Sequence, residues 1–576
     1  MIIGIGETQV DPECRKRIIS EAYADFMIDY GVSLDTIVAN LGACYEPLIE
    51  DTAIAYVPIE NIPKNFFQLY GYGAYPNCYG LLDIGSLDAS GVSKIQNIPN
   101  FDLFGQGVLI GLVDSGIDYT HSTFRNVDGT SKIAAIWDQT IESDSSQPEG
   151  FSFGTEYTQS QLNFALTSPD PFSVVPSTDD VGHGTFLAGI AAGNRIESNS
   201  FSGVVPDAQL AVVKLKPAKK YLRDFWRIPD DAVCYQKHDL IHGINYLVKL
   251  AEQLKMPISI LIGIGTSQGA HDERGALSSY LSTISTKKGV SLTIAGGNEG
   301  NTGHHYYGTI EKEEEFDEVE LKVGPNEQGF SMELWAKTPT TFSIDLRSPN
   351  GEYIARIPAR LGESREIKFI LESTVINVDY QIAESQSGDQ LILVRFRNPS
   401  EGIWKFKVYK SGNLALNYHI WLPMSKFLNY NTFFIKSDPN YTLTSPGNTF
   451  IPIVTTAYNY IDKSIYLESS RGFMRNDNIA PTLAAPGVNM IGPALQHGYT
   501  IGSGTSISAA HTAGVAAMFL EWGIIRGFFP SMSTVEIKIL LIRGAQRNPN
   551  LSYPNKEWGY GILDLYNAYV SLRGDE

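Results

Sequence analysis

The stretch Val108-Leu-Ile-Gly-Leu-Val-Asp-Ser-Gly-Ile-Asp118 decides the fold class of this chain. Its first six residues form a continuous apolar run, which is typical of a parallel strand covered by helices on both faces. Similar runs recur along the chain at 210–215, 258–264, 290–295 and 452–457. Segments with helical spacing occur between them, at 239–255 and 275–288. The pattern predicts an α/β domain built on a doubly wound parallel sheet.

Two further units depart from this pattern. Within the first 80 residues, Arg15 to Tyr30 has helical spacing and Thr52 to Val57 reads as a strand, which predicts a small α+β unit. The turn-rich passage from Tyr70 to Gly80 is expected to be an exposed linker. Short alternating stretches after residue 306 predict an inserted antiparallel β-sandwich. The expected domains are 1–80, 81–306, 307–435 and 436–576, the second and fourth forming one α/β domain.

Composition excludes several classes of function. The chain has 576 residues and a net charge of −19, which argues against a nucleic-acid partner, and its Lys and Arg residues form no extended cluster. It contains no run near the ~20 apolar residues that span a bilayer. The segment Met1 to Glu7 lacks the features of a signal peptide. We therefore expect no membrane insertion and a cytoplasmic or spore-associated location.

Cys14, Cys44, Cys78 and Cys234 form no Cys-x-x-Cys pair and have no His at zinc-ligand spacing. Their spacing favours reduced thiols, although a disulfide among the first three remains open. We expect no metal site and no cofactor.

Three segments carry candidate chemistry. Asp114 ends the apolar strand, His183 stands in Asp180-Val-Gly-His-Gly-Thr, and Ser506 lies in Gly502-Ser-Gly-Thr-Ser-Ile-Ser. Taken singly, the three are explained as a turn residue, a structural histidine and a helix cap. Together they supply a hydroxyl nucleophile, an imidazole base and a carboxylate that orients the base, which predicts a catalytic triad.

These segments resemble those of the subtilisin-like serine proteases, whose triad runs in the order Asp, His, Ser. The resemblance covers about residues 85–303 and 440–570. Ile294-Ala-Gly-Gly-Asn-Glu-Gly300 resembles the oxyanion motif of that family, which implies that Asn298 and the backbone N–H of Ser506 bind the oxyanion. Without the resemblance, Asn298 reads as a turn residue. The expected substrate pocket is lined by Ile262, Gly263, Ile264, Gly265, Ala295, Gly296 and Gly297.

Some positions depart from the family pattern. Ile507 and Ala510 replace the usual Met and Pro; both are packing positions, where we expect no loss of activity. Gly296 replaces the more usual Ala. Thr123 stands where many members have a calcium-ligating Asp, which argues against that calcium site.

The absence of a signal peptide, the short N-terminal unit and the inserted sandwich resemble the Csp-type germination proteases of Clostridia, whose insertion is a jelly roll. The resemblance implies a zymogen whose prodomain, residues 1–80, is cleaved from the chain by its own active site between Tyr70 and Leu82. The expected partners are a protein or peptide substrate, such as the precursor of a spore cortex-lytic enzyme, and the cleaved prodomain.

Two rival functions remain. The chain is alternatively a catalytically silent pseudoprotease that acts as a regulatory or ligand-sensing scaffold, a role that an intact triad argues against. It is alternatively a carbohydrate-binding or adhesion protein that uses the inserted sandwich. Trp335, Trp404 and Trp421 of that unit are predicted to be core residues and not a sugar platform.

Overall fold

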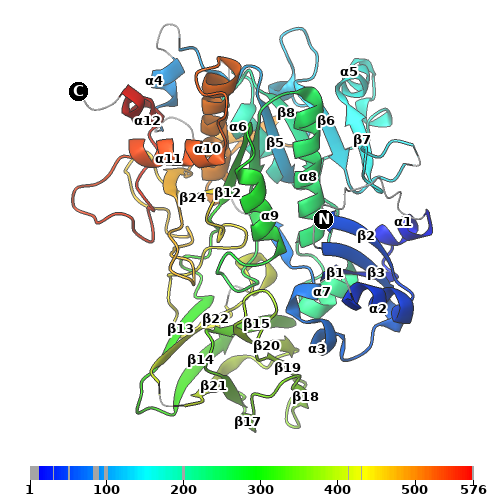
Figure 1. Ribbon diagram of the computed structural model, residues 1–576, viewed down its shortest axis with the longest axis vertical. Helices are drawn as coiled ribbons and strands as arrows, with labels where there is room; N and C mark the ends of the chain where they lie inside the picture. Colours follow the sequence, from blue (N-terminus) through cyan, green and yellow to red (C-terminus); the bar gives the residue numbers. More distant parts are fainter. Residues whose placement is uncertain are drawn as a thin grey trace.

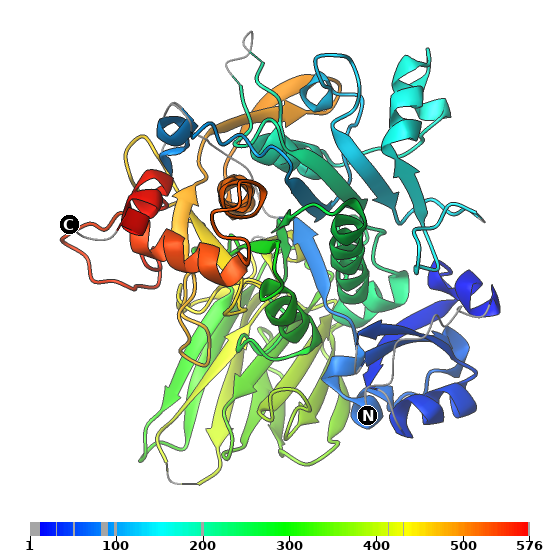
Figure 2. The ribbon, with the colours of Figure 1, turned by 45° about the horizontal axis from the view of Figure 1, so that its top comes forward.

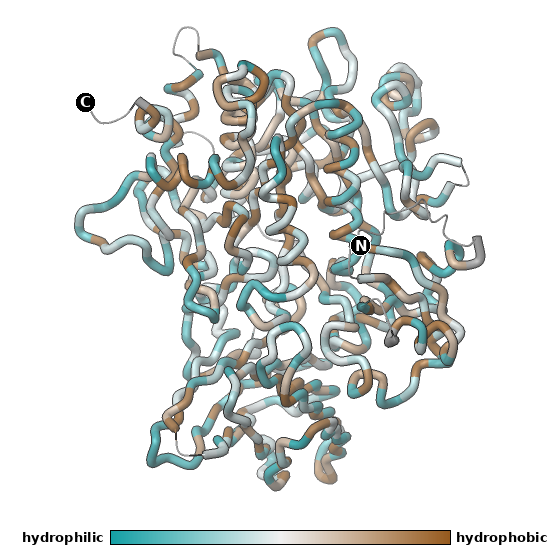
Figure 3. Tube along the Cα trace, viewed as in Figure 1, coloured by the Kyte–Doolittle hydropathy of each residue, from teal (hydrophilic) through white to brown (hydrophobic). Residues whose placement is uncertain are grey.

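The computed structural model describes residues 12–29, 32–49, 52–81, 90–96, 101–143, 145–196, 201–412, 414–429 and 431–573. A central α/β domain carries a β-sandwich at one end, and the N-terminal unit lies beside the sandwich (Figures 1 and 2). Apolar residues follow the central strands and helices, whereas polar residues dominate the outer loops (Figure 3). Within the described ranges, no helix is both long and apolar enough to cross a membrane.

The central sheet has eight strands in the order β25-β24-β12-β10-β5-β8-β6-β7. All neighbouring pairs are parallel except β6 and β7 at one edge. The strands are β5 (Leu109–Asp114), β6 (Ile133–Asp138), β7 (Thr155–Thr158), β8 (Gln209–Lys214), β10 (Ile258–Ile262), β12 (Val290–Ala295), β24 (Ile453–Tyr458) and β25 (Leu483–Pro486). The five apolar runs of the sequence are all strands of this sheet, which confirms the predicted doubly wound architecture.

Helices cover both faces of the sheet because its central strands are apolar on both sides. Strand β5 shows this alternation: Leu109 and Val113 join one hydrophobic core, while Ile110 and Leu112 join the other. The first core also contains α8 and α9, which lie in front of the sheet in Figure 1, and the second contains α6 and α10. The helices of the domain are α4 (Val92–Gln96), α5 (Gln159–Thr167), α6 (His183–Ala192), α7 (Lys220–Trp226), α8 (Lys237–Leu254), α9 (Ala276–Ser285), α10 (Thr505–Leu520), α11 (Thr534–Gly544) and α12 (Leu565–Val570).

The N-terminal unit is a three-stranded antiparallel sheet, in the order β1-β3-β2, with short helices. Its elements are α1 (Pro12–Ile18), β1 (Tyr23–Asp29), α2 (Val32–Leu41), β2 (Cys44–Ile49), β3 (Thr52–Pro58) and α3 (Phe66–Tyr70). The helix predicted for Arg15 to Tyr30 is therefore wrong beyond Ile18. The second half of that segment pairs with β3 along its whole length and buries Ala24, Phe26 and Ile28. Tertiary pairing outweighs the local helical spacing.

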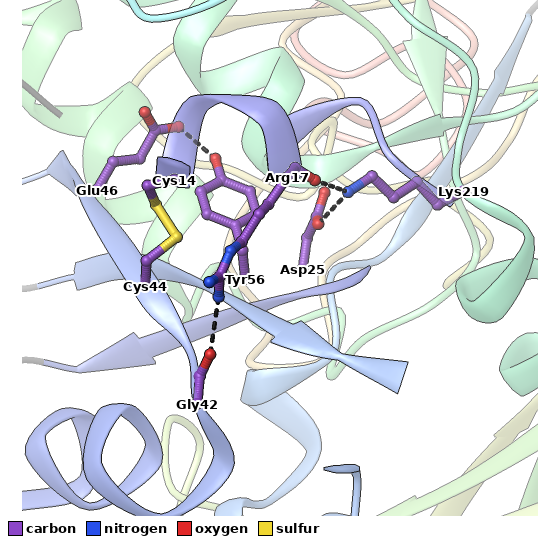
Figure 4. Close-up of a disulfide and its surroundings, with 8 residues drawn as sticks. All are labelled: Cys14, Arg17, Asp25, Gly42, Cys44, Glu46, Tyr56 and Lys219. Atoms are coloured by element: carbon purple, nitrogen blue, oxygen red, sulfur yellow. Dashed lines mark hydrogen bonds and ion pairs between the residues drawn. A yellow bond between two sulfur atoms is a disulfide. The ribbon is translucent and has the colours of Figure 1, made fainter. Parts of the chain in front are cut away.

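A disulfide joins Cys14, in α1, to Cys44, at the start of β2 (Figure 4). It closes a loop of the N-terminal unit across a sequence separation of 30 residues. The expectation that all four thiols are reduced is therefore wrong for this pair. Cys78 and Cys234 remain free thiols, and both are buried.

The passage predicted to be an exposed linker is instead packed into the molecule. Tyr72, Tyr75 and Cys78 are buried, and Tyr75 stacks on Phe225 with ring centroids 3.8 Å apart. The chain then forms β4 (Cys78–Leu81), the middle strand of a small sheet with β9 (Tyr235–Gln236) and β11 (Ile264–Gly265). The turn-forming residues surround two aromatic side chains, Tyr72 and Tyr75, that pack against Trp226 and Phe225.

The inserted unit consists of two antiparallel sheets that enclose one hydrophobic core. One sheet has the order β13-β22-β15-β20-β19-β18 and the other the order β17-β16-β21-β14-β23. The strands are β13 (His305–Ile310), β14 (Phe316–Val323), β15 (Gly329–Ala336), β16 (Phe342–Arg347), β17 (Tyr353–Ile357), β18 (Ser364–Lys368), β19 (Val375–Gln381), β20 (Gln390–Arg397), β21 (Gly402–Lys410), β22 (Leu416–Trp421) and β23 (Phe433–Phe434). Trp335, Trp404 and Trp421 are almost wholly buried, so they form no surface platform for a sugar.

Candidate active site

Three elements bring the predicted triad residues together. Asp114 is the last residue of β5, His183 the first residue of α6, and Ser506 the second residue of α10. Carboxyl ends of parallel strands and the amino ends of the following helices meet at one edge of an open α/β sheet. The topology therefore converts three distant segments of sequence into one cluster.

The side chains of these residues are in hydrogen-bond contact. His183 Nδ1 lies 2.7 Å from Asp114 Oδ1, and His183 Nε2 lies 3.3 Å from Ser506 Oγ. The backbone N–H of Ser115 donates to the same Asp114 oxygen at 2.8 Å. The imidazole thus bridges the carboxylate and the hydroxyl, which is the geometry that general-base activation of a serine requires.

Glycines allow the elements of the triad to approach closely. A Cβ at Gly184 would lie 2.1 Å from the carbonyl oxygen of Gly116, so a side chain there would push α6 away from the loop after β5. A Cβ at Gly514 would lie 2.5 Å from Val204 Cβ and 3.2 Å from the Ala191 carbonyl oxygen of α6. The small residues around His183 and Ser506 are therefore a packing requirement of the site.

Asn298 lies beside the amino end of α10 in an orientation suited to an oxyanion donor. Its Oδ1 accepts from the backbone N–H of Thr505 at 3.1 Å and from the Thr505 hydroxyl at 3.0 Å. This pairing leaves the Nδ2 amide as the outward donor of the side chain. The backbone N–H of Ser506 belongs to the first turn of the same helix, and its role as the second oxyanion donor stays a prediction.

The seven residues predicted to form the substrate pocket divide into two groups. Gly263, Gly265, Gly296 and Gly297 follow the ends of β10 and β12, near the triad. The side chains of Ile262 and Ala295 are instead wholly buried in the hydrophobic cores, so only their backbone could line a pocket and their assignment stays a prediction. They are the last residues of buried strands, and their side chains pack against the covering helices. Ile264 is also wholly buried and pairs with Leu81 of β4.

Thr444 fills the space between the pocket glycines. A Cβ at Gly265 would lie 2.5 Å from Thr444 Oγ1, and one at Gly297 would lie 2.6 Å from the same atom. The hydroxyl donates to the Gly296 carbonyl at 3.3 Å. Thr444 follows the inserted sandwich in sequence, and no local motif marks it, so the sequence analysis missed it.

Strand β4 lies between two short strands, one of which follows a residue close to the triad. Leu81 pairs with Ile264 and Gly80 with Gly265, antiparallel, while Cys78 and Tyr79 pair with β9 on the other side. Gly263 precedes β11, and a Cβ on it would lie 3.4 Å from both His183 Cε1 and Asp114 Oδ2. The chain of β4 therefore runs toward the triad as its residue numbers rise.

A cavity of about 1220 Å³ touches the triad at His183. Its walls come from the loop 229–233, from the hairpin of β26 (Met490–Ala494) and β27 (Gly498–Gly502), and from sandwich loops at 326–328 and 426–429. None of the seven predicted pocket residues lines it. The inserted sandwich thus contributes a wall to the space beside the triad.

Thr123, at the position where a calcium ligand was in question, bonds the Tyr499 hydroxyl through Oγ1 at 2.7 Å. The described residues contain no group of three or more His, Cys, Asp or Glu side chains that could hold a metal ion. Nearby, the buried Lys132 ammonium donates to the Pro206 carbonyl at 2.6 Å and to Asn194 Oδ1 at 3.0 Å. The Lys132 side chain therefore supplies hydrogen bonds to oxygen atoms that face this part of the interior.

Comparison with known proteins identifies the class. Residues 105–312 and 413–561 match the model of the subtilase family, Peptidase_S8. The match covers more than half of the chain, so the chain belongs to the subtilase family of subtilisin-like serine proteases.

Among solved structures, the CspB protease of Clostridium perfringens superposes with a TM-score of 0.74 and 28% sequence identity. The superposition covers 84% of this chain and 97% of that one. Subtilisin-like protease SBT1.9 of Arabidopsis thaliana is 26% identical over 38% of this chain, and a C5a peptidase of Streptococcus pyogenes is 20% identical over 78% of it. The alignments cover only 28% and 38% of those two relatives.

Proposed function

We propose that this chain is a serine endopeptidase that uses Asp114, His183 and Ser506 as its triad. The observation that carries the proposal is the imidazole of His183, which lies 3.3 Å from the Ser506 hydroxyl and 2.7 Å from the Asp114 carboxylate. Two continuous hydrogen bonds link three segments from different parts of the sequence. A purely structural role for each residue would not explain why all three side chains lie in one hydrogen-bonded chain.

In the proposed reaction, His183 removes the Ser506 proton as Oγ attacks the substrate carbonyl, and Asp114 stabilises the resulting imidazolium. The Asn298 amide and the Ser506 N–H stabilise the developing oxyanion. His183 then donates its proton to the leaving amine. The contact between Thr505 and Asn298 fixes the donor before substrate arrives, so little reorganisation accompanies the reaction.

A fluorophosphonate probe tests this proposal against a silent pseudoprotease. We expect the probe to label wild-type protein and not Ser506→Ala, with Ser503→Ala as the matched control. Ser503 lies three residues earlier and accepts a hydrogen bond from the Asn489 N–H. Labelling of Ser506→Ala equal to wild type, or no labelling of wild-type protein freed of its N-terminal unit, contradicts the proposal.

We further propose that residues 1–80 are a prodomain that the enzyme cleaves and that then blocks the groove. Strand β4 supports this role because it pairs with β9 and β11 as an extended peptide substrate would. Its direction favours cleavage just after Leu81, at the C-terminal end of the window from Tyr70 to Leu82; Leu82 lies outside the described residues.

A buried contact network supports the prodomain as a bound inhibitor. Lys219 Nζ lies 2.5 Å from Asp25 Oδ1 and donates to the Arg17 carbonyl at 3.0 Å, so a catalytic-domain lysine reaches into the N-terminal unit (Figure 4). Gln68 and Tyr72 donate to Asp379 and Glu333 of the sandwich. The unit therefore contacts both other parts of the molecule.

N-terminal sequencing tests self-cleavage. We expect purified wild-type protein to give a new N-terminus within two or three residues after Leu81, and Ser506→Ala to remain one chain. Two fragments from Ser506→Ala, made in a protease-free translation system, contradict self-cleavage.

The similarity to CspB protease over almost the whole of that chain favours a role in activating another zymogen. We propose as substrate the precursor of a spore cortex-lytic enzyme, with germination as the setting. Incubating the two purified proteins should shorten the precursor only when Ser506 is present. An intact precursor after incubation with enzyme that cleaves a generic peptide contradicts this substrate.

A further inference from the structure

Two free thiols lie at the junction of the proposed prodomain and the catalytic domain. Cys78 is the first residue of β4, and Cys234 directly precedes β9. In the ladder between these strands, Cys78 pairs with Gln236 and Tyr79 with Tyr235. Residues two apart in an extended strand share a face, so Cys234 is the diagonal neighbour of Cys78 on the same face. Both side chains are almost wholly buried, 0% and 1% exposed.

The two sulfur atoms are chemically different. The Cys78 thiol hydrogen-bonds the sulfur of Cys234, and Arg223 Nε donates to the same sulfur at 3.3 Å. The hydrogen bond from Cys78 and the Arg223 guanidinium lower the pKa of Cys234 against the effect of burial, while burial raises the pKa of Cys78. Cys234 is therefore the more acidic thiol of the pair, and the thiolate form is the nucleophile of disulfide exchange.

We propose that Cys78 and Cys234 form a disulfide that tethers strand β4 to the catalytic domain. The bond itself requires only the juxtaposition of the two sulfurs. Its consequence rests on the proposed function, because Cys78 lies on the N-terminal side of the proposed cleavage point. After cleavage, the disulfide keeps the prodomain covalently attached with β4 beside the triad.

The oxidant is a small-molecule disulfide such as glutathione disulfide. The Cys234 thiolate attacks one of its sulfurs and releases one glutathione thiolate, which forms a mixed disulfide on Cys234. Cys78 loses its proton to the released thiolate and attacks the Cys234 sulfur, which releases the second glutathione. The two protein thiols lose two electrons and two protons, and the glutathione disulfide gains them. Because both sulfurs are buried in the docked chain, glutathione disulfide reacts with Cys234 while β4 is undocked, when Arg223 still lowers the pKa of Cys234. The bond to Cys78 closes when β4 docks again.

The short ladder permits the bond to close. Diagonal neighbours in an antiparallel ladder have Cα atoms roughly 7–8 Å apart, and disulfides span up to about 6.8 Å, so a shift of roughly 1 Å is needed. Strand β4 has four residues and pairs with each neighbour through two residue pairs. A strand paired through so few residues can move by this distance without breaking a long series of backbone hydrogen bonds.

The tether makes inhibition respond to redox conditions. A covalently attached inhibitor stays at a local concentration of roughly millimolar whatever the dilution, whereas a cleaved and untethered prodomain dissociates as the solution is diluted. Reduction of one bond therefore converts a permanently covered groove into one that opens on dilution. The Cys14–Cys44 disulfide lies wholly inside the N-terminal unit and cannot act this way.

The full chain tests the tether. Wild-type protein is treated with glutathione disulfide, alkylated, and run on gels with and without dithiothreitol. We expect one band without reductant and two bands with it. Cys78→Ser should give two bands under both conditions, and the matched control Cys14→Ser should behave as wild type. On dilution, peptidase activity of the oxidised wild type should rise roughly tenfold or more after reduction, and that of Cys78→Ser by less than about twofold.

Peptide mapping of Ser506→Ala separates the tether from self-cleavage. This variant should contain a peptide pair linked through Cys78 and Cys234 although its chain is uncut. If the linked pair is found but wild-type protein is also uncut, self-cleavage fails and the bond stands. Alkylated Cys78 and Cys234, or only mixed glutathione adducts, after oxidation and refolding overturn the tether even if cleavage occurs. Cys234→Ala repeats the test if Cys78→Ser does not fold.

Discussion

Two wholly buried aspartates serve opposite purposes in this molecule. Asp114, at the triad, is bonded through Oδ1 to His183 and to the Ser115 N–H, while Oδ2 has no hydrogen-bond partner among the described residues. Asp25, in the N-terminal unit, uses both oxygens: Oδ1 pairs with Lys219 at 2.5 Å, and Oδ2 lies 3.3 Å from His238 Nε2. Both carboxylates are 0% exposed.

The difference lies in how each buried charge is compensated. Burial raises the pKa of Asp25, but Lys219, His238 and Lys216 outweigh burial and hold that pKa well below its usual range. Asp25 is thus a fixed charge that joins two units. Asp114 faces one group, His183, that must gain and lose a proton during the proposed reaction. Its charge is left available to stabilise the imidazolium.

Replacing the carboxylate at the triad should give the largest effect. In Asp114→Asn the amide cannot stabilise the imidazolium and favours the wrong tautomer of His183, so we expect kcat to fall about 10⁴-fold. Peptide hydrolysis by protein freed of its N-terminal unit measures this fall. Thermal unfolding serves as the control and should change little, because the two side chains have the same size. A decrease in kcat of less than tenfold would show that Asp114 is a structural residue like Asp25.

Removing the partner of Asp25 should weaken docking and leave the triad intact. Lys219→Met leaves a buried carboxylate whose remaining contacts include Lys216 at 4.0 Å and His238 Nε2 at 3.3 Å. We expect a cost of about 3 kcal/mol, measured as a lower unfolding temperature of the N-terminal unit in a Ser506→Ala background.

The adjacent lysine provides a matched control for this experiment. Lys220 pairs with Asp224 at 2.9 Å, but both side chains are more than half exposed. Lys220→Met should therefore leave the unfolding temperature of the N-terminal unit almost unchanged, because the exposed pair is screened by solvent. Equal effects of the two substitutions would contradict the assignment of Lys219 as the buried link between the units.

A third buried carboxylate, that of Glu333, makes the folding stability depend on pH. Glu333 of the sandwich accepts from the Tyr72 hydroxyl at 3.0 Å and from Trp335 Nε1 at 2.9 Å, and burial raises its pKa to about 7. Between pH 4.5 and 7, the folded state still holds a proton on Glu333 that the unfolded state has released. The stability that the protonated Glu333 contributes to the folded state is therefore lost as pH rises through that window.

Glu333→Gln should remove this dependence because the amide is uncharged at every pH. Relative to wild type, we expect the variant to gain up to about 3 kcal/mol on going from pH 5 to pH 8. Urea unfolding at the two pH values, in the Ser506→Ala background, measures the change. A difference between variant and wild type that is the same at both pH values contradicts a raised pKa for Glu333.

The segments that carry the triad could be predicted from the sequence, whereas the contacts that dock the N-terminal unit on the catalytic domain could not. Asp114 and Ser506 stand in local motifs, next to apolar runs or small residues whose spacing already indicates a strand or a helix. The contact between Asp25 and Lys219 depends on how two separately folded units dock, and no local spacing encodes it. Thr444 was missed for the same reason, because the inserted sandwich separates it in sequence from the glycines that it contacts.

The N-terminal unit shows how tertiary contacts override local signals. The spacing from Arg15 to Tyr30 indicated one helix, but pairing with β3 turns its second half into a strand. The disulfide between Cys14, in the first half of α1, and Cys44, at the start of β2, is a further tertiary contact that the local spacing did not indicate. Tyr72 and Tyr75 read as turn residues until their partners Trp226 and Phe225 are brought against them by docking.

The smallest expected effect probes the unpaired oxygen of Asp114. In Gly263→Ala, the new Cβ would lie 2.5 Å from Leu187 Cδ1 and 3.4 Å from both Asp114 Oδ2 and His183 Cε1. Overpacking of this kind costs about 1–3 kcal/mol, and we expect the displaced imidazole to lower kcat roughly tenfold. The control is Gly498→Ala, in the hairpin of β26 and β27, where the new Cβ meets no atom closer than 3.6 Å. Gly263→Ala that retains full kcat and loses only stability would show that the space beside Asp114 Oδ2 serves packing alone. The functional difference between Asp114 and Asp25 would then depend only on the hydrogen bond between Asp114 and His183.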